Sequence, residues 1–415
     1  MTDTNIVTIS VSSIFLPYYL TGITLISLAL YILINKRTRA YLLIHKCYKL
    51  LMTLFTFLLV VPMAYGNWIG ITAGIGLILA FVLGQFQRCV MTRELFENLL
   101  TLVCKLSLTS AVCALIDKFL IPLIDHDFNA NRISAVFFYP NYFGTIAATV
   151  IIICAYKVLS QRSGWFFCLI GAVNVISLYL CESMFAFVEV FIGIAVLLVL
   201  YHRKRLFLLW LILALGGVAA VLGLNLELIP RLSDADLTTK LRIHIWAKAV
   251  DKIRENPLIG HGSMTYAFES YRSGALVMHA HSLYLDSFLN YGILGVLLFL
   301  WYFADYYLSV LRTCFKEKQL LITTLILSVT GAALVHGMVD LTLLWVQTLP
   351  LFLFILSGYG AYEKEENAPP PVLIFPKYPF PVRVHSGSHI FTGGGLLPAK
   401  KRSGVKVTYR NKNAG

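Results

Sequence analysis

The sequence predicts an all-α, polytopic integral membrane protein. Of its 415 residues, 58% are hydrophobic and only 13% are charged, and the mean hydropathy is +0.76. Soluble globular proteins are far less apolar, with about a quarter of their residues charged. Because backbone groups in lipid must pair within a helix or a closed barrel, long apolar runs favour helices. A helix needs roughly 20 apolar residues to cross a bilayer.

Eleven apolar runs predict about eleven transmembrane helices with one long extracytoplasmic loop. Basic residues follow the first, third, fifth, seventh and ninth runs, all on one side by simple alternation. An excess of Lys and Arg marks the cytoplasmic side, so the loop at about residues 225–282 is expected outside. The runs lie at about residues 13–34, 48–65, 69–85, 98–122, 142–159, 165–181, 183–201, 206–224, 283–308, 319–337 and 341–361.

Composition divides the chain into a transmembrane domain, residues 1–361, and a tail, residues 362–415. The tail contains three consecutive prolines, has no helical period and ends in a basic stretch, which predicts a disordered cytoplasmic segment. Loops and tail account for the net charge of +13, so nucleic-acid binding is not expected. The eight cysteines lack metal-ligand spacing, which favours a role as small apolar core residues.

An arginine on the apolar face of a helix is the first candidate for chemistry. Residues 242–254 have helical period, and Arg242 lies one turn before Trp246 on the apolar side. Burying a guanidinium is costly unless an anion or another acceptor meets it. Asn256 and Pro257 are expected to end this helix. Arg242 is therefore a candidate for ligand binding.

A second arginine, Arg132, is expected on the same side of the membrane, ahead of an aromatic stretch and the Pro140-Asn141 pair. Two guanidiniums suit a phosphate or pyrophosphate, because their forked donors bind such oxygens bidentately and stay charged at any relevant pH. The alternative is that each side chain only extends to the membrane interface. For Arg132 the sequence does not favour either interpretation. For Arg242 it favours ligand binding over a position at the interface.

The outer loop closes with His279 and His281. Two histidines that alternate on an extended segment resemble a metal pair, but no carboxylate or cysteine cluster in the loop supplies further ligands, so we predict no metal site. His281 fits a general base, since a neutral imidazole can take a proton from a hydroxyl group. The alternative is a histidine that is only hydrogen-bonded at the interface. Asp286, little more than one helical turn later, is placed to orient an imidazole or to bind sugar hydroxyls.

Six short motifs follow one another between about residues 125 and 360. They are Arg132 with Tyr139-Pro140-Asn141, Arg242-x-x-x-Trp246, Asn256-Pro257-Leu258-Ile259-Gly260-His261-Gly262, His281-Ser282-x-x-Leu285, Tyr291-Gly292-x-x-Gly295 and His336-Gly337-x-x-Asp340. In type, order and predicted side of the membrane they resemble those of the O-antigen ligase and O-antigen polymerase superfamily of membrane glycosyltransferases. The chain departs from that pattern in having His281-Ser282 for His-Asn. It also has Ser183-Met184-Phe185 for Ser-Arg-Gly, without the arginine.

The resemblance implies transfer of a glycan from an undecaprenyl-pyrophosphate carrier to an acceptor hydroxyl. It places the reaction at the outer face of a bacterial cytoplasmic membrane, in the synthesis of cell-envelope polysaccharide such as lipopolysaccharide. It further implies inversion, without a metal, nucleotide sugar or other cofactor. Ligation to a lipid, polymerisation of repeat units and attachment to protein share these motifs, so the acceptor stays open.

The resemblance also assigns roles to the candidate residues. Arg132 and Arg242 would hold the pyrophosphate, whose charge grows as the glycosidic bond breaks, and His281 would deprotonate or orient the acceptor hydroxyl. An apolar groove between spans would take the polyprenyl chain. The other predicted substrate contacts are His279, Trp246, His261, Asn141 and Asp286.

Two alternatives belong to other classes of protein. A transporter or flippase of a lipid-linked or small polar substrate would use Asp286, Asp305 and Asp340 as coupling carboxylates. Such a protein is expected to carry internal inverted repeats, and we find no repeat in the sequence. The third interpretation is a non-catalytic membrane scaffold. The motif residues are predicted at the outer surface, which favours the transferase.

Overall fold

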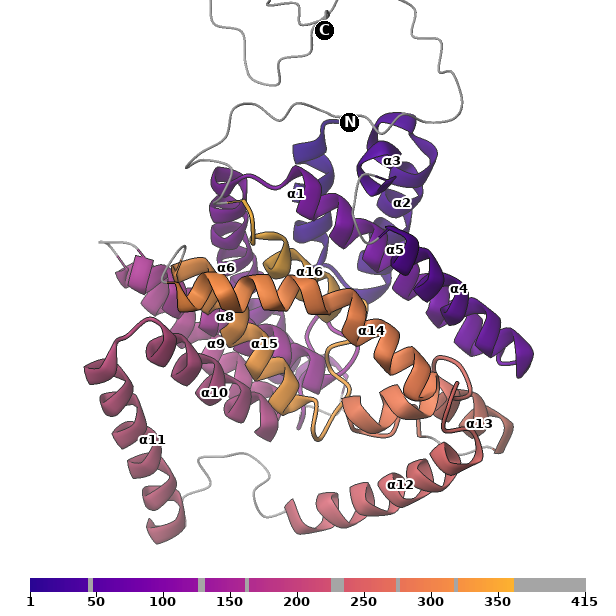
Figure 1. Ribbon diagram of the computed structural model, residues 1–415. Helices are drawn as coiled ribbons and strands as arrows, with labels where there is room; N and C mark the ends of the chain where they lie inside the picture. The colour runs from indigo at the N-terminus through magenta and orange to yellow at the C-terminus, as the bar shows by residue number, and fades with distance from the viewer. Residues whose placement is uncertain are drawn as a thin grey trace, which may run out of the picture. The chain divides into compact units, whose positions relative to one another are not determined.

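A computed structural model describes residues 1–43, 48–125, 131–160, 164–224, 235–273, 277–316 and 320–361 (Figure 1). These residues form helices joined by turns, with no strand among them, as predicted. All of the described residues belong to one compact unit. The predicted tail, residues 362–415, lies outside the described residues.

Each predicted apolar run contains a helix. These helices are α2 (Tyr18–Ile34), α4 (Tyr48–Ala64), α5 (Trp68–Val90), α6 (Arg93–Leu115), α8 (Pro140–Ser160), α9 (Trp165–Cys181), α10 (Met184–Leu200), α11 (Lys204–Leu224), α14 (Leu283–Phe315), α15 (Leu320–His336) and α16 (Thr348–Ser357). The remaining elements are α1 (Asp3–Ser13), α3 (Lys36–Leu43), η1 (Ile116–Leu120), α7 (Ile121–Ile124), α12 (Ala235–Glu255) and α13 (Thr265–Ser273).

The helices are those of a membrane protein. By length and composition, four of the described helices can cross a membrane, or up to five if the bent pair α2 and α3 is one span. Several of the other apolar helices are only 10–17 residues long, shorter than the roughly 20 residues that a perpendicular span needs. The count of eleven spans stays a prediction.

Helix α8 lies at the centre of the described core, with 78% of its apolar window buried. It contacts α9, α10 and α15, as Figure 1 shows. Small residues permit this close packing: a Cβ added at Gly144 would lie 2.8 Å from the Cβ of Ser183, and one at Gly193 would lie 2.1 Å from Ile152 Cδ1. The packing brings the first turn of α8, the start of α10 and the end of α15 together.

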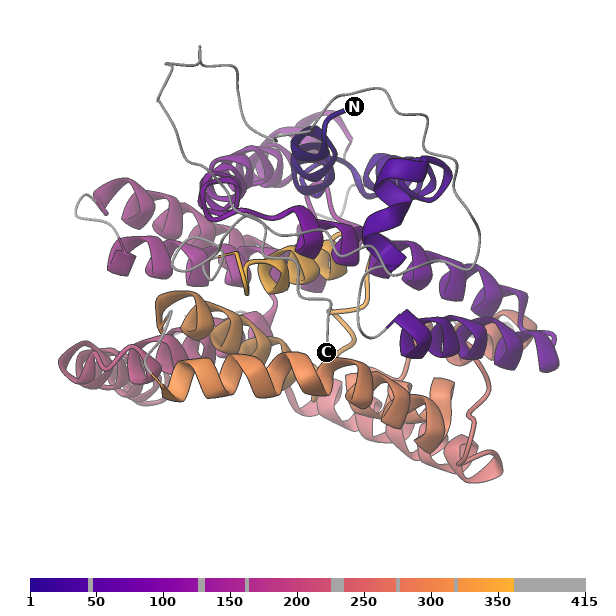
Figure 2. The same cartoon turned by 45° about the horizontal axis from the view of Figure 1, so that its top comes forward.

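The predicted outer loop contains two helices, α12 and α13. Helix α12 ends at Glu255, where Asn256-Pro257 predicted its end. Figures 1 and 2 both show α12 lying along the first part of α14. Residues 225–234 and 274–276 of this loop are outside the described part of the chain, so the full course of the loop stays a prediction.

A break in α14 receives the turn that follows α12. Gly292 has φ 58° and ψ −170° within the helix, a conformation that favours glycine. The turn bonds to the helix on both sides of the break: the N–H groups of His261 and Gly262 donate to the carbonyls of Leu289 and Asn290 at 3.1 and 2.8 Å. Conversely, Ile293 N–H donates to the Pro257 carbonyl at 2.8 Å. The Asn256–Gly262 motif therefore anchors α12 against α14.

Candidate active site

Two short segments form the base of the site, one before α14 and one after α15. The N–H of Leu283 donates to the carbonyl of Gly337 at 2.7 Å. A Cβ at Gly337 would lie 2.9 Å from the Cβ of Leu283, so the close approach depends on glycine. This contact places His281 opposite Asp340.

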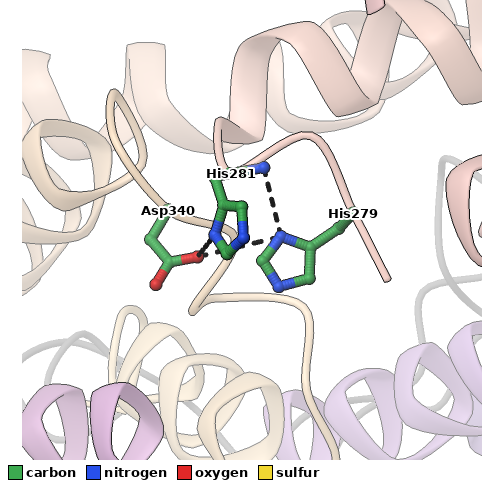
Figure 3. A group of neighbouring side chains, drawn as sticks. All are labelled: His279, His281 and Asp340. Atoms are coloured by element: carbon green, nitrogen blue, oxygen red, sulfur yellow. Dashed lines mark hydrogen bonds and ion pairs between the residues drawn. The ribbon is translucent and has the colours of Figure 1, made fainter. Parts of the chain in front are cut away.

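His281 and Asp340 form a hydrogen-bonded pair (Figure 3). His281 Nδ1 lies 3.2 Å from Asp340 Oδ1, and Asp340 is buried. Burial raises the pKa of Asp340, but the hydrogen bond from His281 and the nearby imidazoles His279, His281 and His336 outweigh it and hold the pKa below its usual range. An ionised carboxylate accepts, so His281 donates through Nδ1–H and its Nε2 is left to take a proton.

The backbone of His281 is unusual. Its φ of 49° lies in the left-handed region, which few residues other than glycine adopt. Backbone strain of this kind costs of order 1–3 kcal/mol and occurs preferentially at functional sites. Two neighbours hold the segment in place: Trp246 Nε1 donates to the His281 carbonyl at 3.3 Å, and Asp286 accepts the N–H of Ala280 at 3.2 Å.

His279 supports His281 from one side. Its Nδ1 accepts the backbone N–H of His281 at 3.2 Å, and the two rings lie 4.3 Å apart. Burial lowers the pKa of His279 to about 4, so its imidazole is neutral at pH 7. A neutral ring that accepts through Nδ1 positions its neighbour without adding charge.

Arg132 is connected to the same carboxylate through Asn141. The Nη2 of Arg132 donates to Asn141 Oδ1 at 2.8 Å, and Asn141 Nδ2 donates to Asp340 Oδ2. Within the described chain, the buried Nε of Arg132 has no hydrogen-bond partner. The Nη1 of Arg132 donates to the Tyr139 hydroxyl at 3.3 Å, so both Nη atoms are held within the protein, and each carries a second N–H that can face a ligand.

A cavity of about 200 Å³ contains both arginines and His281. Arg242 reaches it from α12, with its guanidinium 5.5 Å from the centre of the Phe185 ring. Apolar side chains from α10 and α12 complete the wall. The lining residues are Arg132, Tyr139, Asn141, Glu182, Ser183, Met184, Phe185, Leu241, Arg242, Ile245, His281 and His336.

Four of the eight predicted site residues line this cavity: Arg132, Asn141, Arg242 and His281. Trp246, His279 and Asp286 lie behind it and hold the His281 segment through the bonds given above. His261 lies elsewhere: its Nε2 is 3.0 Å from Asn256 Nδ2, and its ring is 5.2 Å from that of Tyr65.

Spacing along the chain suggested Asp286 as the partner of the His281 imidazole, but Asp340 forms that bond. Asp286 bonds to backbone instead. The buried pair of His336 and Glu189, 2.6 Å apart beside the cavity, was also not predicted as part of the site. The sequence signals were that His336 begins the His336-Gly337-x-x-Asp340 motif and that Glu189 is an ionisable residue within an apolar run, a kind of residue that tends to face a cavity.

The prediction of no metal site rested on the lack of a carboxylate or cysteine cluster in the same loop that could supply further ligands, and Asp340 supplies a carboxylate from another segment. Ligand atoms of His279, His281 and Asp340 lie within 4.8 Å of one another. Figure 3 shows the three side chains turned toward one another. However, each facing atom is already hydrogen-bonded: His279 Nδ1 by the N–H of His281, and Asp340 Oδ1 by His281 and the N–H of Leu341. We therefore interpret the group as a proton-handling network.

This interpretation predicts that chelators leave activity unchanged. Purified protein treated with EDTA, and then passed through a metal-free column, is expected to retain its full activity. Added Mg²⁺ or Zn²⁺ should not increase the rate. Two results together would instead assign a metal to the three residues. Chelation would lower the activity of the wild type and Zn²⁺ would restore it, whereas chelation would not change the activity of a His279→Gln variant.

An apolar groove of about 440 Å³ runs between α2, α5, α14 and the segment before α16. It ends beside the site, because Leu341 and Trp345 line it; Leu341 follows Asp340 directly, and the Trp345 ring lies 6.3 Å from that of His279. On α5, Gly76 faces it with open space where a Cβ would be. A groove of this composition suits a hydrocarbon chain.

Comparison with known families finds one match. Residues 147–300 match the model of the family described as O-Antigen ligase. The matched region starts within α8 and ends within α14, so it includes Arg242 and His281 but not Arg132, Asn141 or Asp340. Among curated proteins, none matches the chain.

Proposed function

We propose, from the O-antigen ligase domain that this chain carries, that the protein transfers a glycan from an undecaprenyl-pyrophosphate carrier to an acceptor hydroxyl. The reaction takes place at the outer face of the bacterial cytoplasmic membrane. The observation that carries the proposal is the single cavity that contains Arg132, Arg242 and the Nδ1-bonded imidazole of His281. It combines an anion site with a base, as displacement of a pyrophosphate requires.

The two arginines serve the leaving group. When the bond between the anomeric carbon and the phosphate oxygen breaks, its electron pair stays on that oxygen and the pyrophosphate gains negative charge. Guanidinium groups fixed in advance stabilise this charge more in the transition state than in the bound substrate. Arg132 is fixed through Asn141, and Arg242 lies over Phe185.

His281 serves the nucleophile. The acceptor oxygen forms a bond to the anomeric carbon, and its proton passes to Nε2 of His281. Asp340, which accepts from Nδ1, holds the required tautomer and stabilises the imidazolium that results. One displacement with no covalent intermediate inverts the anomeric configuration. The proton then leaves to solvent, and undecaprenyl pyrophosphate departs.

The apolar groove takes the polyprenyl chain of the carrier. We expect Gly76→Leu to fill the groove without disturbing the helix, because a Cβ at Gly76 meets nothing within 4 Å. The KM for the carrier substrate should rise about tenfold or more, since misplacing a few methylenes in a pocket costs ~1–3 kcal/mol. Gly216→Leu is the matched control: Gly216 is an exposed glycine on α11, also with open space at its Cβ. Equal KM values for the two variants would contradict this assignment.

The experiment that tests the function uses detergent micelles, which have no second compartment. Purified protein is given an undecaprenyl-pyrophosphate oligosaccharide and a mixture of lipid, glycan and peptide acceptors. A transferase consumes the carrier-linked substrate and releases undecaprenyl pyrophosphate, whereas a transporter leaves both unchanged. The transporter hypothesis gains no support from its three carboxylates: Asp305 is exposed, while Asp286 and Asp340 hydrogen-bond within the His281 segment.

A further inference from the structure

The pair of His336 and Glu189 is buried beside the cavity and is not among the predicted site residues. His336 ends α15 and Glu189 is in the second turn of α10. His336 Nδ1 and Glu189 Oε2 are 2.6 Å apart, and both side chains are only 1% exposed. Thr145 Oγ1 on α8 is 3.3 Å from the same nitrogen. Ionisable groups this deep among apolar helices are costly and usually face a functional cavity.

His336 does face the cavity that contains the arginines. Its ring stacks on Phe185, with centres 6.4 Å apart and planes at 29°. Phe185 also contacts the guanidinium of Arg242, which lies 5.5 Å from the centre of its ring. Because the Glu189 carboxylate accepts from Nδ1–H, Nε2 is the nitrogen of His336 that remains for a ligand.

The net charge around the cavity determines whether a proton must be taken up when an anionic ligand binds. The charged groups are Arg132, Arg242 and Glu182 in the lining, and Asp340 and Glu189 bonded to the lining histidines. With neutral imidazoles, two guanidiniums face three carboxylates, which leaves one net negative charge. A pyrophosphate adds further negative charge, and in a site of low dielectric that repulsion is strong. Binding is therefore favoured if a proton enters with the ligand.

Two imidazoles line the cavity, and only one can hold that proton during the reaction. His281 must keep Nε2 unprotonated to receive the proton of the acceptor hydroxyl. His336 has no such role, and Glu189 can neutralise its imidazolium. Building on the proposed function, we propose that His336, paired with Glu189, is a third anion-binding group of the cavity and takes up one proton when pyrophosphate binds. Its Nε2–H then donates to a phosphate oxygen.

Proton uptake can be measured directly on the full-length protein. Calorimetric titration with undecaprenyl pyrophosphate is run in two buffers of different ionisation enthalpy at the same pH, and the difference gives the protons taken up per ligand. The wild type should take up about one proton more than His336→Gln. Its Kd should also rise with pH more steeply than that of the variant, by up to about tenfold per pH unit for one linked proton. Protonation of the ligand itself contributes equally to both proteins.

Two further variants complete the test. Glu189→Gln retains His336 but removes its counter-charge, and should also lower the proton count. His244→Gln changes an exposed histidine of α12 that lies outside the cavity and should behave as wild type. A pair that only joins α10 to α15 predicts lower thermal stability in His336→Gln with an unchanged proton count, which would overturn the inference.

The outcomes also separate this inference from the function on which it rests. Tight binding with the same proton count in wild type and His336→Gln contradicts only the role of His336. Absence of proton uptake by the wild type also contradicts the role of His336, and this result does not depend on whether the variants fold. Failure of the wild type to bind undecaprenyl pyrophosphate contradicts both proposals.

Discussion

His281→Asn is expected to lower kcat for glycan transfer by about 10²–10⁴-fold, the usual contribution of a positioned general base. Asparagine suits this test because it tolerates the left-handed backbone (φ 49°) of His281 better than alanine. A loss therefore cannot be assigned to backbone strain. Carrier binding should change little, since the arginines and His336 remain. The measurement is kcat and KM with a carrier-linked oligosaccharide at saturating acceptor.

Asp340→Asn provides the companion to this variant. An amide can donate to Nδ1 and so favour the tautomer with the proton on Nε2, which cannot act as a base. We expect a loss of kcat similar in order to that of His281→Asn, and a double variant little worse than either single one, because the two residues act as one unit. Additive losses would show that Asp340 acts separately from His281.

Arg242→Lys is expected to lower kcat/KM by about 10²–10³-fold, the range observed when one fixed donor to a developing charge is removed. Lysine retains the positive charge but loses the planar fork that can bind two phosphate oxygens and lie over Phe185. The kcat/KM of Arg242→Ala should be lower than that of Arg242→Lys.

Arg254→Lys is the matched control on the same helix. Arg254 is largely exposed and pairs with Asp251 at 3.1 Å, a surface contact worth little, so its substitution should be neutral. Full activity of Arg242→Lys would show that Arg242 supplies only diffuse charge. Full activity of Arg242→Ala would remove it from the site.

The sequence predicted the helices far better than the contacts between them. Apolar runs and proline signals are local, so each run contains a helix and α12 ends at Glu255. The partner of His281 could not be predicted this way, because Asp340 lies 59 residues away. The bond from Asn141 to Asp340 spans 199 residues. Asp286 is closer to His281 in sequence, but it accepts a hydrogen bond from the N–H of Ala280 instead.

The motifs predicted which residues line the cavity better than they predicted the role of each residue. Arg132, Arg242 and His281 were predicted as ligand-facing residues, and the cavity contains all three. The Asn256–Gly262 motif was predicted to contribute His261 to the substrate, yet it fits the break at Gly292 in α14. Glu189 belongs to no motif, and its pairing with His336 depends on how α10 lies against α15.

The most direct test of the account measures stoichiometry in one reaction. Wild type, His281→Asn and Arg242→Ala, at equal concentration and in the presence of EDTA, receive an undecaprenyl-pyrophosphate oligosaccharide with mixed acceptors. Mass spectrometry then quantifies released undecaprenyl pyrophosphate and glycosylated product. The account predicts one carrier released per glycan transferred by the wild type, and neither by the variants. Equal transfer by all three proteins, or consumption of no carrier by the wild type, would contradict it.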